Sequence, residues 1–454
     1  ELAGAAGLKL FIENLRTGFP DWNCTIEDTM AAGDKVMVRY LCAGTHTGEW
    51  NDLAPTGKSI QFQSIIVHRI ADGQVAEDWS EYDSLGWMQQ LGFVLGPPAQ
   101  AAAGDGAPPV LVAGAQIRSP NGIKVGPAGN LYVANGFGQA ILVIDPDTGE
   151  ILKRLGPEAG VDGPDDLAFG PDGSIYWTDL FRGTVGRLTP DGATSSQTVA
   201  PGVNPIAVGP DGRVYVGLAF MGDALYVLDA ELAGPPQLLA EGLGGLNSFE
   251  FGADGLLYAP VMDRGEVVRI DVDSDPIQIE TVAAELDGPV AVKFDAAGDL
   301  FALAAPGIVR IDPTTGAVET VASIPYGLDN FAIDAAGRLF VSLITEGTIA
   351  EVMADDTLRM LGATGLVLPG GLAVLPTAEG ETVYQGDFWM LRQFDGATGA
   401  VLADPLGIPG GTVAADGPDL VLTNSFVNVV AVWNPQTDEM LAMHFDFALS
   451  LIHI

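Results

Sequence analysis

The sequence predicts an α+β domain followed by an all-β propeller, and two patterns carry this prediction. The first is a unit of strand, glycine turn and strand that returns eight times between residues 110 and 446. The second is one amphipathic helix followed by a series of strands within residues 1–95. A period near 40 residues with several short strands in each period is typical of propeller blades. A helix followed by antiparallel strands is typical of an α+β domain.

The propeller repeat is clearest in GPDDLAFGPDGSIYWTDLFRGTVGRL, residues 163–188, which reads as three strands separated by a Pro-Asp-Gly turn and a polar loop. The turn favours glycine because its backbone needs a positive φ. Successive turn glycines lie 37 to 44 residues apart, and they are Gly129, Gly173, Gly212, Gly255, Gly298, Gly337, Gly380 and Gly417. We therefore expect a single propeller of eight blades. Seven is the alternative, because the copies at Gly380 and Gly417 are irregular.

The first 95 residues predict a separate small domain. Residues 5–18 place Leu8, Leu10, Phe11 and Leu15 at the spacing of an amphipathic helix. Strands separated by Gly-Asp and Asp-Gly turns follow, and residues 84–94 read as a short closing helix. Residues 96–109 are rich in Pro, Ala and Gly and are expected to be a linker.

The propeller is expected to occupy residues 110–446, and residues 110–115 are expected to close its ring. Residues 447–454 fit no blade and are left unassigned. Because the chain begins with Glu1 rather than Met, we expect a fragment or a processed form. A signal peptide and the cellular location stay open.

Composition limits the partners of this protein. With 59 acidic and 20 basic side chains, the net charge is −39, which argues against nucleic acid because its phosphates would be repelled. No apolar run approaches the roughly 20 residues that a membrane helix needs. Cys24 and Cys42 are too few for a disulfide scaffold. We expect them to be buried small side chains, with one bridge as the alternative.

Aligning the repeats on their turn glycine reveals a polar position eight residues upstream. Five of the first six repeats carry an amide or an acid there: Asn121, Asp165, Asn204, Asn247 and Asp329. The innermost strands of a propeller line its channel, so these side chains are expected to form a ring at one mouth. Their oxygens suit a hard cation such as Ca²⁺. The alternative is that they cap backbone groups where a loop enters a strand.

The loop after the second strand is expected on the same face as this ring. It carries a polar side chain in four repeats: Asn135, Asp179, Asp387 and Asn424.

Residues 5–95 resemble the SnoaL-like polyketide cyclases, because GTHTGEW, PTGK and RIADGQ…DW…D occur in that order. The resemblance implies a cone of helices and sheet around an apolar pocket, here without its first helices. It also implies an acid–base pair, for which His68 and Asp83 are the first candidates. His46 and Asp78 are the second-choice candidates for this pair.

The repeats resemble NHL and YWTD-type propellers, and more specifically the gluconolactonase and strictosidine-synthase-like group. DGPDDLAFGPDGSIYWTD and SPNGIKVGPAGNLYV carry the closer resemblance. It implies a divalent cation held by one Glu, two Asn and one Asp, with the last Asp also acting as a base. The Asn ligands correspond to Asn121 and to Asn204 or Asn247, and the Asp to Asp165 or Asp329.

Two features depart from that group. The position of the Glu ligand holds Asp162 or Asp287, and the group has six blades.

These observations support two hypotheses. The first is a cation-dependent hydrolase of lactones or esters at the channel mouth, with Asp165 and Asp329 as catalytic candidates. The second is a non-catalytic propeller that binds a small molecule or a protein, with the N-terminal domain as an accessory pocket. The first expected partner is a small-molecule substrate or ligand, a protein partner is open under the second hypothesis, and no nucleic acid and no membrane are expected. The oligomeric state stays open.

Overall fold

The computed structural model divides the chain into two compact units, which are described separately. One unit comprises residues 1–111 together with 369–453, and the other comprises residues 112–368. The structure describes residues 4–50, 53–71, 73–82, 84–91, 110–219, 221–324, 329–377, 380–407, 411–424 and 429–445. The expected linker 96–109 and tail 447–454 therefore lie outside the described residues.

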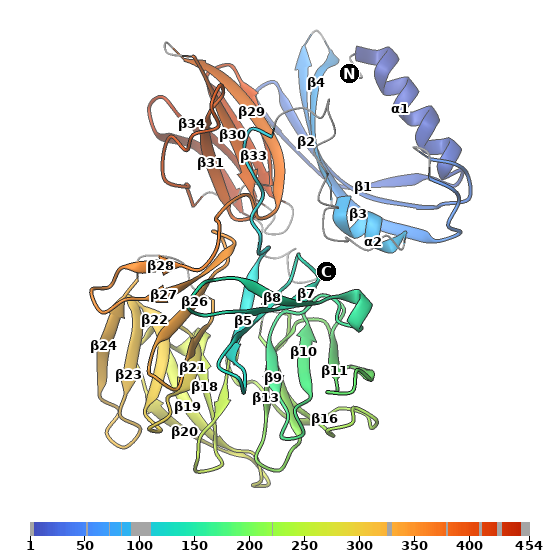
Figure 1. The fold of residues 1–454 in the computed structure, drawn as a ribbon. Coiled ribbons are helices and arrows are strands. Elements are labelled where there is room, and N and C mark those ends of the chain that lie inside the picture. The colour runs from blue at the N-terminus through green and yellow to red at the C-terminus, as the bar shows by residue number, and fades with distance from the viewer. Residues whose placement is uncertain are drawn as a thin grey trace. The chain divides into compact units, whose positions relative to one another are not determined.

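The unit 112–368 is built from four-stranded antiparallel sheets (Figure 1). The first two are β5(Pro120–Val125), β6(Leu131–Asn135), β7(Ala140–Ile144), β8(Ile151–Leu155), and β9(Leu167–Phe169), β10(Ile175–Asp179), β11(Thr184–Leu188), β12(Thr194–Thr198). The next two are β13(Val203–Val208), β14(Val214–Leu218), β15(Ala224–Leu228), β16(Gln237–Glu241), and β17(Glu250–Phe251), β18(Leu257–Val261), β19(Glu266–Asp271), β20(Gln278–Ala283). The last two are β21(Asp287–Phe294), β22(Leu300–Ala305), β23(Gly307–Ile311), β24(Val318–Ser323), and β25(Phe331–Ile333), β26(Leu339–Leu343), β27(Thr348–Val352), β28(Leu358–Met360).

The turn between the first two strands of each sheet has the backbone that the repeat predicts. Gly129 and Gly173 have φ of 85° and 82°, a region that favours glycine because it has no Cβ. The equivalent glycines of the other four sheets are also at positive φ. All six turns therefore lie at one end of the innermost strands. We call this end the turn face and the opposite end the mouth.

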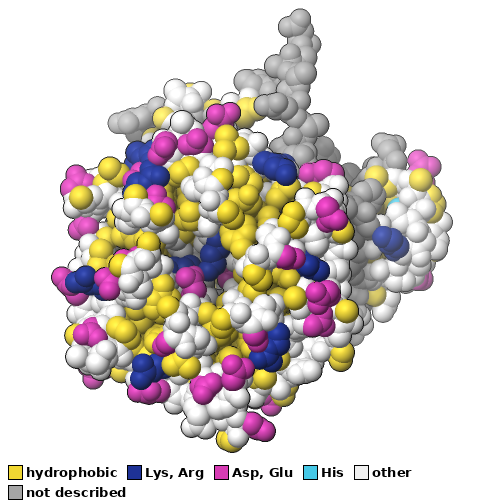
Figure 2. Space-filling view, turned by 60° about the horizontal axis from the view of Figure 1, so that its bottom comes forward, with side chains coloured by type: hydrophobic (Ala, Val, Ile, Leu, Met, Phe, Trp, Pro, Cys, Tyr) yellow, Lys and Arg dark blue, Asp and Glu magenta, His cyan; other side chains and the backbone are white. Residues whose placement is uncertain are grey.

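The innermost strands form a closed ring of six. In order, β5 contacts β9, β9 contacts β13, β13 contacts β17, β17 contacts β21, β21 contacts β25, and β25 contacts β5. Gly114 pairs in parallel with Leu366, so the segment before the first sheet joins the chain that follows the sixth. This isolated bridge involves Gly114 of the expected closing segment 110–115, but that segment forms no strand of the sixth sheet, and residues 110 and 111 belong to the other unit. Figure 2 shows a central hollow in this ring.

The expectation of eight blades in one ring, with seven as the alternative, is therefore wrong for this structure. The repeats at Gly380 and Gly417 do form sheets, but these belong to the other unit. The glycine turn dictates only the local strand pairing. How many sheets share one axis depends on packing between sheets, which the turn does not report.

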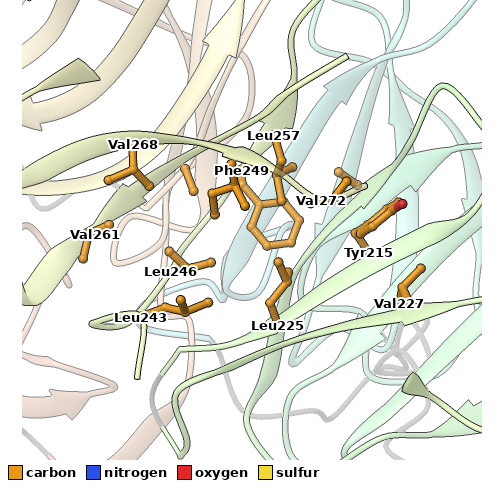
Figure 3. Close-up of a cluster of buried hydrophobic side chains, with 13 residues drawn as sticks. Tyr215, Leu225, Val227, Leu243, Leu246, Phe249, Leu257, Val261, Val268 and Val272 are labelled. Carbon is orange, nitrogen blue, oxygen red and sulfur yellow. The ribbon is translucent and has the colours of Figure 1, made fainter. Parts of the chain in front are cut away.

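Apolar side chains fill the spaces between neighbouring sheets of the ring. One cluster joins the third and fourth sheets, where Phe249 packs with Leu225 of β15 and Leu257 of β18 (Figure 3). A second cluster joins the first and sixth sheets through Ile123 of β5 and Phe340 of β26. The apolar packing therefore continues across the point where the ring closes.

The other unit begins with the predicted α+β segment. It contains α1(Gly4–Gly18), β1(Asn23–Ala32), β2(Lys35–Thr45), β3(Ser59–Ala71), β4(Gln74–Tyr82) and α2(Ser84–Gln90), with the strands in the sheet order β1-β2-β3-β4. Its core is aromatic, with Phe19, Trp50 and Trp87 in mutual ring contact. Both predicted helices are present. No described helix is long and apolar enough to cross a membrane.

Cys24 and Cys42 are joined by a disulfide, so the preferred expectation of two free cysteines is wrong. The two residues lie directly opposite each other on β1 and β2. That register brings their side chains together, a relationship that the separation of the two cysteines along the chain does not reveal.

Two further sheets complete this unit: β29(Pro369–Thr377), β30(Gly380–Asp387), β31(Met390–Asp395), and β32(Thr412–Asp416), β33(Asp419–Asn424), β34(Val429–Asn434), β35(Glu439–Phe445). They pack on each other through a cluster that includes Tyr384 and Trp433. They belong to the unit that does not contain the closed ring, so the ring covers less of the chain than the expected propeller range 110–446.

Candidate functional site

The five predicted mouth residues all belong to the closed ring. Asn121 and Asn204 lie in β5 and β13, whereas Asp165, Asn247 and Asp329 lie two or three residues before β9, β17 and β25. The fifth sheet contributes Val290 of β21 at the equivalent position. The residues were predicted from an eight-bladed alignment, yet none falls outside the six sheets that close.

Asn121 and Asp165 meet across the boundary between the first and second sheets. Asn121 donates from Nδ2 to Oδ1 of Asp165 at 3.0 Å. The other carboxyl oxygen of Asp165, Oδ2, is buried and has no hydrogen-bond partner in the structure. A buried carboxylate oxygen without a partner is costly, so Asp165 needs either a proton or a cation there.

The pKa of Asp165 is consistent with a proton or a cation at this oxygen. Burial raises the pKa of Asp165 well above its ordinary value, and the neighbouring carboxyl groups of Asp329, Asp166 and Asp179 raise it further. The pKa of Asp329 is also raised, to about 7, first by burial and then by Asp166, while Lys293 opposes the shift. The mouth therefore gathers carboxyl groups from the second and sixth sheets without enough positive charge to balance them.

The two remaining amides give a mixed result. Asn204 and Asn247 are both buried. Asn247 accepts a hydrogen bond at Oδ1 from the backbone N–H of Ser248 at 2.8 Å, and its Nδ2 points to Sδ of Met262 at 3.5 Å. The oxygen of Asn247 thus serves the capping role that the sequence left open. The described contacts link Asn121, Asp165 and Asp329, and they do not link Asn204 or Asn247 to them.

The loops after the second strands do not add cation ligands. Asn135 accepts the N–H of Arg118 at Oδ1, at 2.7 Å. Asp179 is buried and paired with Arg182 at 2.9 Å, and Asp162 pairs with the same Arg182 at 2.6 Å. Asn135 and Asp179 are thus engaged in structural contacts, whereas Oδ1 of Asp162 is buried and has no hydrogen-bond partner in the structure.

Asp387 and Asn424 lie in β30 and β33 of the other unit, so their expected place beside the ring is wrong. Asp287, the alternative for the missing Glu, begins β21 and is exposed. Within the part of the chain that the structure describes, no group of three His, Cys, Asp or Glu side chains is arranged to hold a metal ion. The candidate site therefore depends on amide as well as carboxyl oxygens.

A second charged layer lies deeper in the channel, and the sequence reasoning missed it. Lys124 of β5 donates from Nζ to Oε2 of Glu250 in β17 at 2.6 Å. Lys293 of β21 donates from Nζ to Oγ of Ser248 at 2.8 Å. Lys124, Glu250 and Lys293 each lie five positions before the turn glycine of their repeat, so the same repeat alignment could have found them.

The buried side chain of Asp166 connects the two layers electrostatically. Burial raises the pKa of Asp166, and Lys293 and Lys124 oppose that shift. Burial also lowers the pKa of Lys293 to about 7, assisted by the nearby charge of Lys124. In Glu250, burial acts to raise the pKa, but Lys124 and Lys293 outweigh it, so the pKa is lowered.

In the N-terminal segment, the structure describes His68, the first member of the predicted pair, together with a neighbouring acid. His68 lies opposite Asp78 on β3 and β4, and its Nδ1 is 2.5 Å from Oδ1 of Asp78. Asp83 lies outside the described residues. Asp78, the second-choice acid of the sequence analysis, is thus the described partner of His68.

His46, the other second-choice residue, is fully buried and stacks on Phe19. Its Nδ1 lies 3.2 Å from Oγ1 of Thr56, and its Nε2 has no hydrogen-bond partner in the structure.

Comparisons with known proteins agree with both resemblances. Residues 1–91 match the family described as SnoaL-like polyketide cyclase. A gluconolactonase from Zymomonas mobilis is 32% identical over 135 residues, which is 26% of this chain and 36% of that relative. The matched stretch thus spans little more than a third of the curated relative.

Solved structures that match part of this chain include virginiamycin B lyase from Staphylococcus aureus, at 18% identity over 60% of this chain and 92% of that chain, with a TM-score of 0.42. They also include TsrD from Streptomyces laurentii, at 29% identity over 20% of this chain and 66% of that chain, with a TM-score of 0.19. By the family match and the curated relative, the chain combines an N-terminal segment similar to SnoaL-like polyketide cyclases with a β-propeller segment similar to a gluconolactonase.

Proposed function

We propose that this protein is a cation-dependent hydrolase of lactones or related esters, acting at the mouth of the propeller channel. The observation that carries the proposal is the buried Oδ2 of Asp165, which has no partner although its carboxyl group faces further acids. A divalent cation bound there would satisfy this oxygen and balance the surrounding charge. Similarity to a gluconolactonase suggests sugar lactones as the first substrates to test.

The residues at the mouth fit such an ion. Asp165 would supply a carboxylate oxygen and Asn121 an amide oxygen, since its Nδ2 is the atom that bonds Asp165. Asn204 and Asn247 are the further candidates, and Asn247 would have to release its backbone contact. A bound divalent cation polarises an ester carbonyl and acidifies water. The ring of six sheets also matches the six blades that the gluconolactonase-like resemblance implies.

Asp329 is the proposed base. Its pKa of about 7 is near the value at which a carboxylate both accepts a proton and exists ionised in neutral solution. In lactone hydrolysis the water oxygen bonds to the carbonyl carbon, and the ring C–O bond breaks. Asp329 would take the proton from water and return it to the alkoxide that leaves.

The alternative function is a binding protein without turnover. The capping contact of Asn247 favours it, because an amide engaged with the backbone is a poorer ligand. In this case the His68–Asp78 pair and the aromatic core of the N-terminal segment would serve as an accessory small-molecule pocket.

Two measurements on the full chain separate these functions. Thermal unfolding is followed with and without Ca²⁺ or Mn²⁺, and hydrolysis of glucono-δ-lactone is followed by acid release with and without EDTA. A site-specific cation at 100 times its Kd should stabilise the fold by about 2.7 kcal/mol. The test variant is Asp165→Asn, and the matched control is Asp191→Asn in an exposed turn.

The hydrolase proposal expects stabilisation and lactone hydrolysis in the wild type and in Asp191→Asn, and loss of both in Asp165→Asn. Stabilisation without hydrolysis of any lactone would favour the binding protein. If no cation stabilises the wild type, the cation site itself is disproved.

A further inference from the structure

The turn face of the channel holds a pocket that is distinct from the mouth. It has a volume of about 270 Å³ and is lined by two residues from each of the six innermost strands. Small lactone or aromatic ligands need cavities of roughly this size or somewhat larger, since typical ligand pockets measure about 300–1,000 Å³. Figure 2 shows this hollow, with basic and acidic side chains at its floor and hydrophobic side chains around it.

The floor and the rim of this pocket differ in chemistry. The floor positions are those five residues before the turn glycines, and they are Lys124, Ala168, Ala207, Glu250, Lys293 and Ala332. The three alanines leave space beside the three charged side chains. The rim positions follow directly in sequence and are all apolar: Val125, Phe169, Val208, Phe251, Phe294 and Ile333. A ligand entering from the turn face would pass apolar side chains and end at charged ones.

The charges on the floor are unevenly satisfied. Lys124 has a carboxylate partner in Glu250 at 2.6 Å. Lys293 is only 3% exposed, and its described side-chain hydrogen bond goes to the neutral hydroxyl of Ser248. An ammonium has three N–H donors, so Lys293 retains capacity to bind an anion that reaches the floor.

We propose that this pocket is a second small-molecule site, which binds a monocarboxylate with a small apolar body through the ammonium of Lys293. The apolar rim would enclose the body of the ligand, and its carboxylate would accept a hydrogen bond from the ammonium of Lys293. The proposal does not depend on hydrolysis at the mouth. Benzoate is a suitable probe because it joins one carboxylate to one flat apolar ring.

Carboxylate binding at this site should be coupled to proton uptake. The charged groups that face Lys293 are Lys124 from β5, Glu250 from β17, and Asp166 and Asp329 from the loops before β9 and β25. Burial and Lys124 lower the pKa of Lys293 to about 7, so near neutral pH part of the population is uncharged. A carboxylate favours the charged form, because an opposite charge raises the pKa of a lysine.

The test is calorimetric titration of the full chain with sodium benzoate at pH 6 and at pH 8.5. Affinity should be greatest at pH 6 and should fall above pH 7 by up to about tenfold per pH unit, as expected when binding requires one proton. At pH 8, the measured enthalpy should vary with the ionisation enthalpy of the buffer, because protons are taken up. Benzamide, which has the same shape but no charge, should bind at least tenfold more weakly.

Two variants locate the site. Lys293→Met keeps an unbranched side chain, one atom shorter, and removes its charge, and it should lower benzoate affinity at pH 6 at least tenfold. Lys153→Met changes an exposed lysine on the outer strand β8 and should leave affinity unchanged. Proton uptake in the wild type tests the coupling even if Lys293→Met does not fold.

Three results would overturn the proposal. They are no benzoate binding to the wild type at pH 6, equal affinity in Lys293→Met, and binding that is independent of pH between 6 and 8.5. Inorganic phosphate is titrated alongside. If phosphate binds and benzoate does not, the apolar monocarboxylate is the wrong ligand class.

Discussion

Asn121 donates a hydrogen bond to Asp165 across 3.0 Å, although the two residues are 44 positions apart in the chain. They occupy the same position in successive repeats, so the contact shows that neighbouring sheets bring equivalent residues together at the mouth. The amide satisfies only one oxygen of Asp165 and adds no charge. The other oxygen, Oδ2, is what makes this mouth a candidate cation site.

The first prediction concerns Asp329 and pH. Because its folded-state pKa is about 7, above the ordinary 3.8, the folded protein keeps this proton between those values while the unfolded chain has lost it. Stability should therefore fall as pH rises through this window, by at most about 1.4 kcal/mol per pH unit from this group. Asp329→Asn should make the decline shallower, and the raised pKa values of Asp165, Asp166 and Asp179 contribute to what remains.

Hydrogen exchange measured on peptides from residues 112–368 between pH 5 and pH 7 checks this, after correction for the intrinsic exchange rate. An unchanged slope in Asp329→Asn would show that this carboxyl group is not held in its neutral form.

The second prediction concerns the Lys124–Glu250 pair. Its side chains are 17% and 27% exposed, so the pair is partly protected from water. Glu250→Gln should destabilise the propeller by about 3 kcal/mol, because Lys124 is left without its counter-charge. The control is Glu280→Gln, which removes an exposed partner of Arg269 and should cost less than about 1 kcal/mol. Urea unfolding of both variants measures the difference, and equal losses would contradict a protected pair.

The third prediction concerns packing between sheets. Phe249 is 1% exposed and lies in the cluster that joins the third and fourth sheets. Phe249→Ala should cost about 3–5 kcal/mol, since the ring sheets leave little freedom to fill the cavity. Leu238→Ala, at a largely exposed position on β16, should cost less than about 0.5 kcal/mol. Thermal and urea unfolding give both values, and a small loss for Phe249→Ala would show that the interface can repack.

The fourth prediction concerns the disulfide. A non-reducing peptide digest should contain the Cys24 and Cys42 peptides as one linked species, which reduction separates. The bridge closes a loop of 18 residues, for which chain entropy predicts about 3 kcal/mol of stabilisation. Replacing both residues by Ser should therefore speed hydrogen exchange in β1 and β2 and leave residues 112–368 unchanged. Separate unlinked peptides in the unreduced digest would contradict the pairing.

The sequence predicted the local parts of this fold well. The turn glycines identified six strand pairs of the ring because a positive φ restricts the residue at that place. The same alignment led to Asn121, Asp165 and Asp329, which the structure brings into one electrostatic group. It could equally have led to Lys124, Glu250 and Lys293, had positions nearer the turn been compared.

The sequence by itself determined where the strands turn and which polar side chains recur at equivalent positions, because backbone conformation and side-chain alternation are local properties. Only the tertiary structure decided that six sheets close the ring and that the sheets from Pro369 onward belong to the other unit. It also decided that Cys24 faces Cys42 and that His68 faces Asp78. The physical reason is that ring closure and strand register depend on contacts between residues far apart in the chain. Those contacts are selected by the packing of whole apolar surfaces.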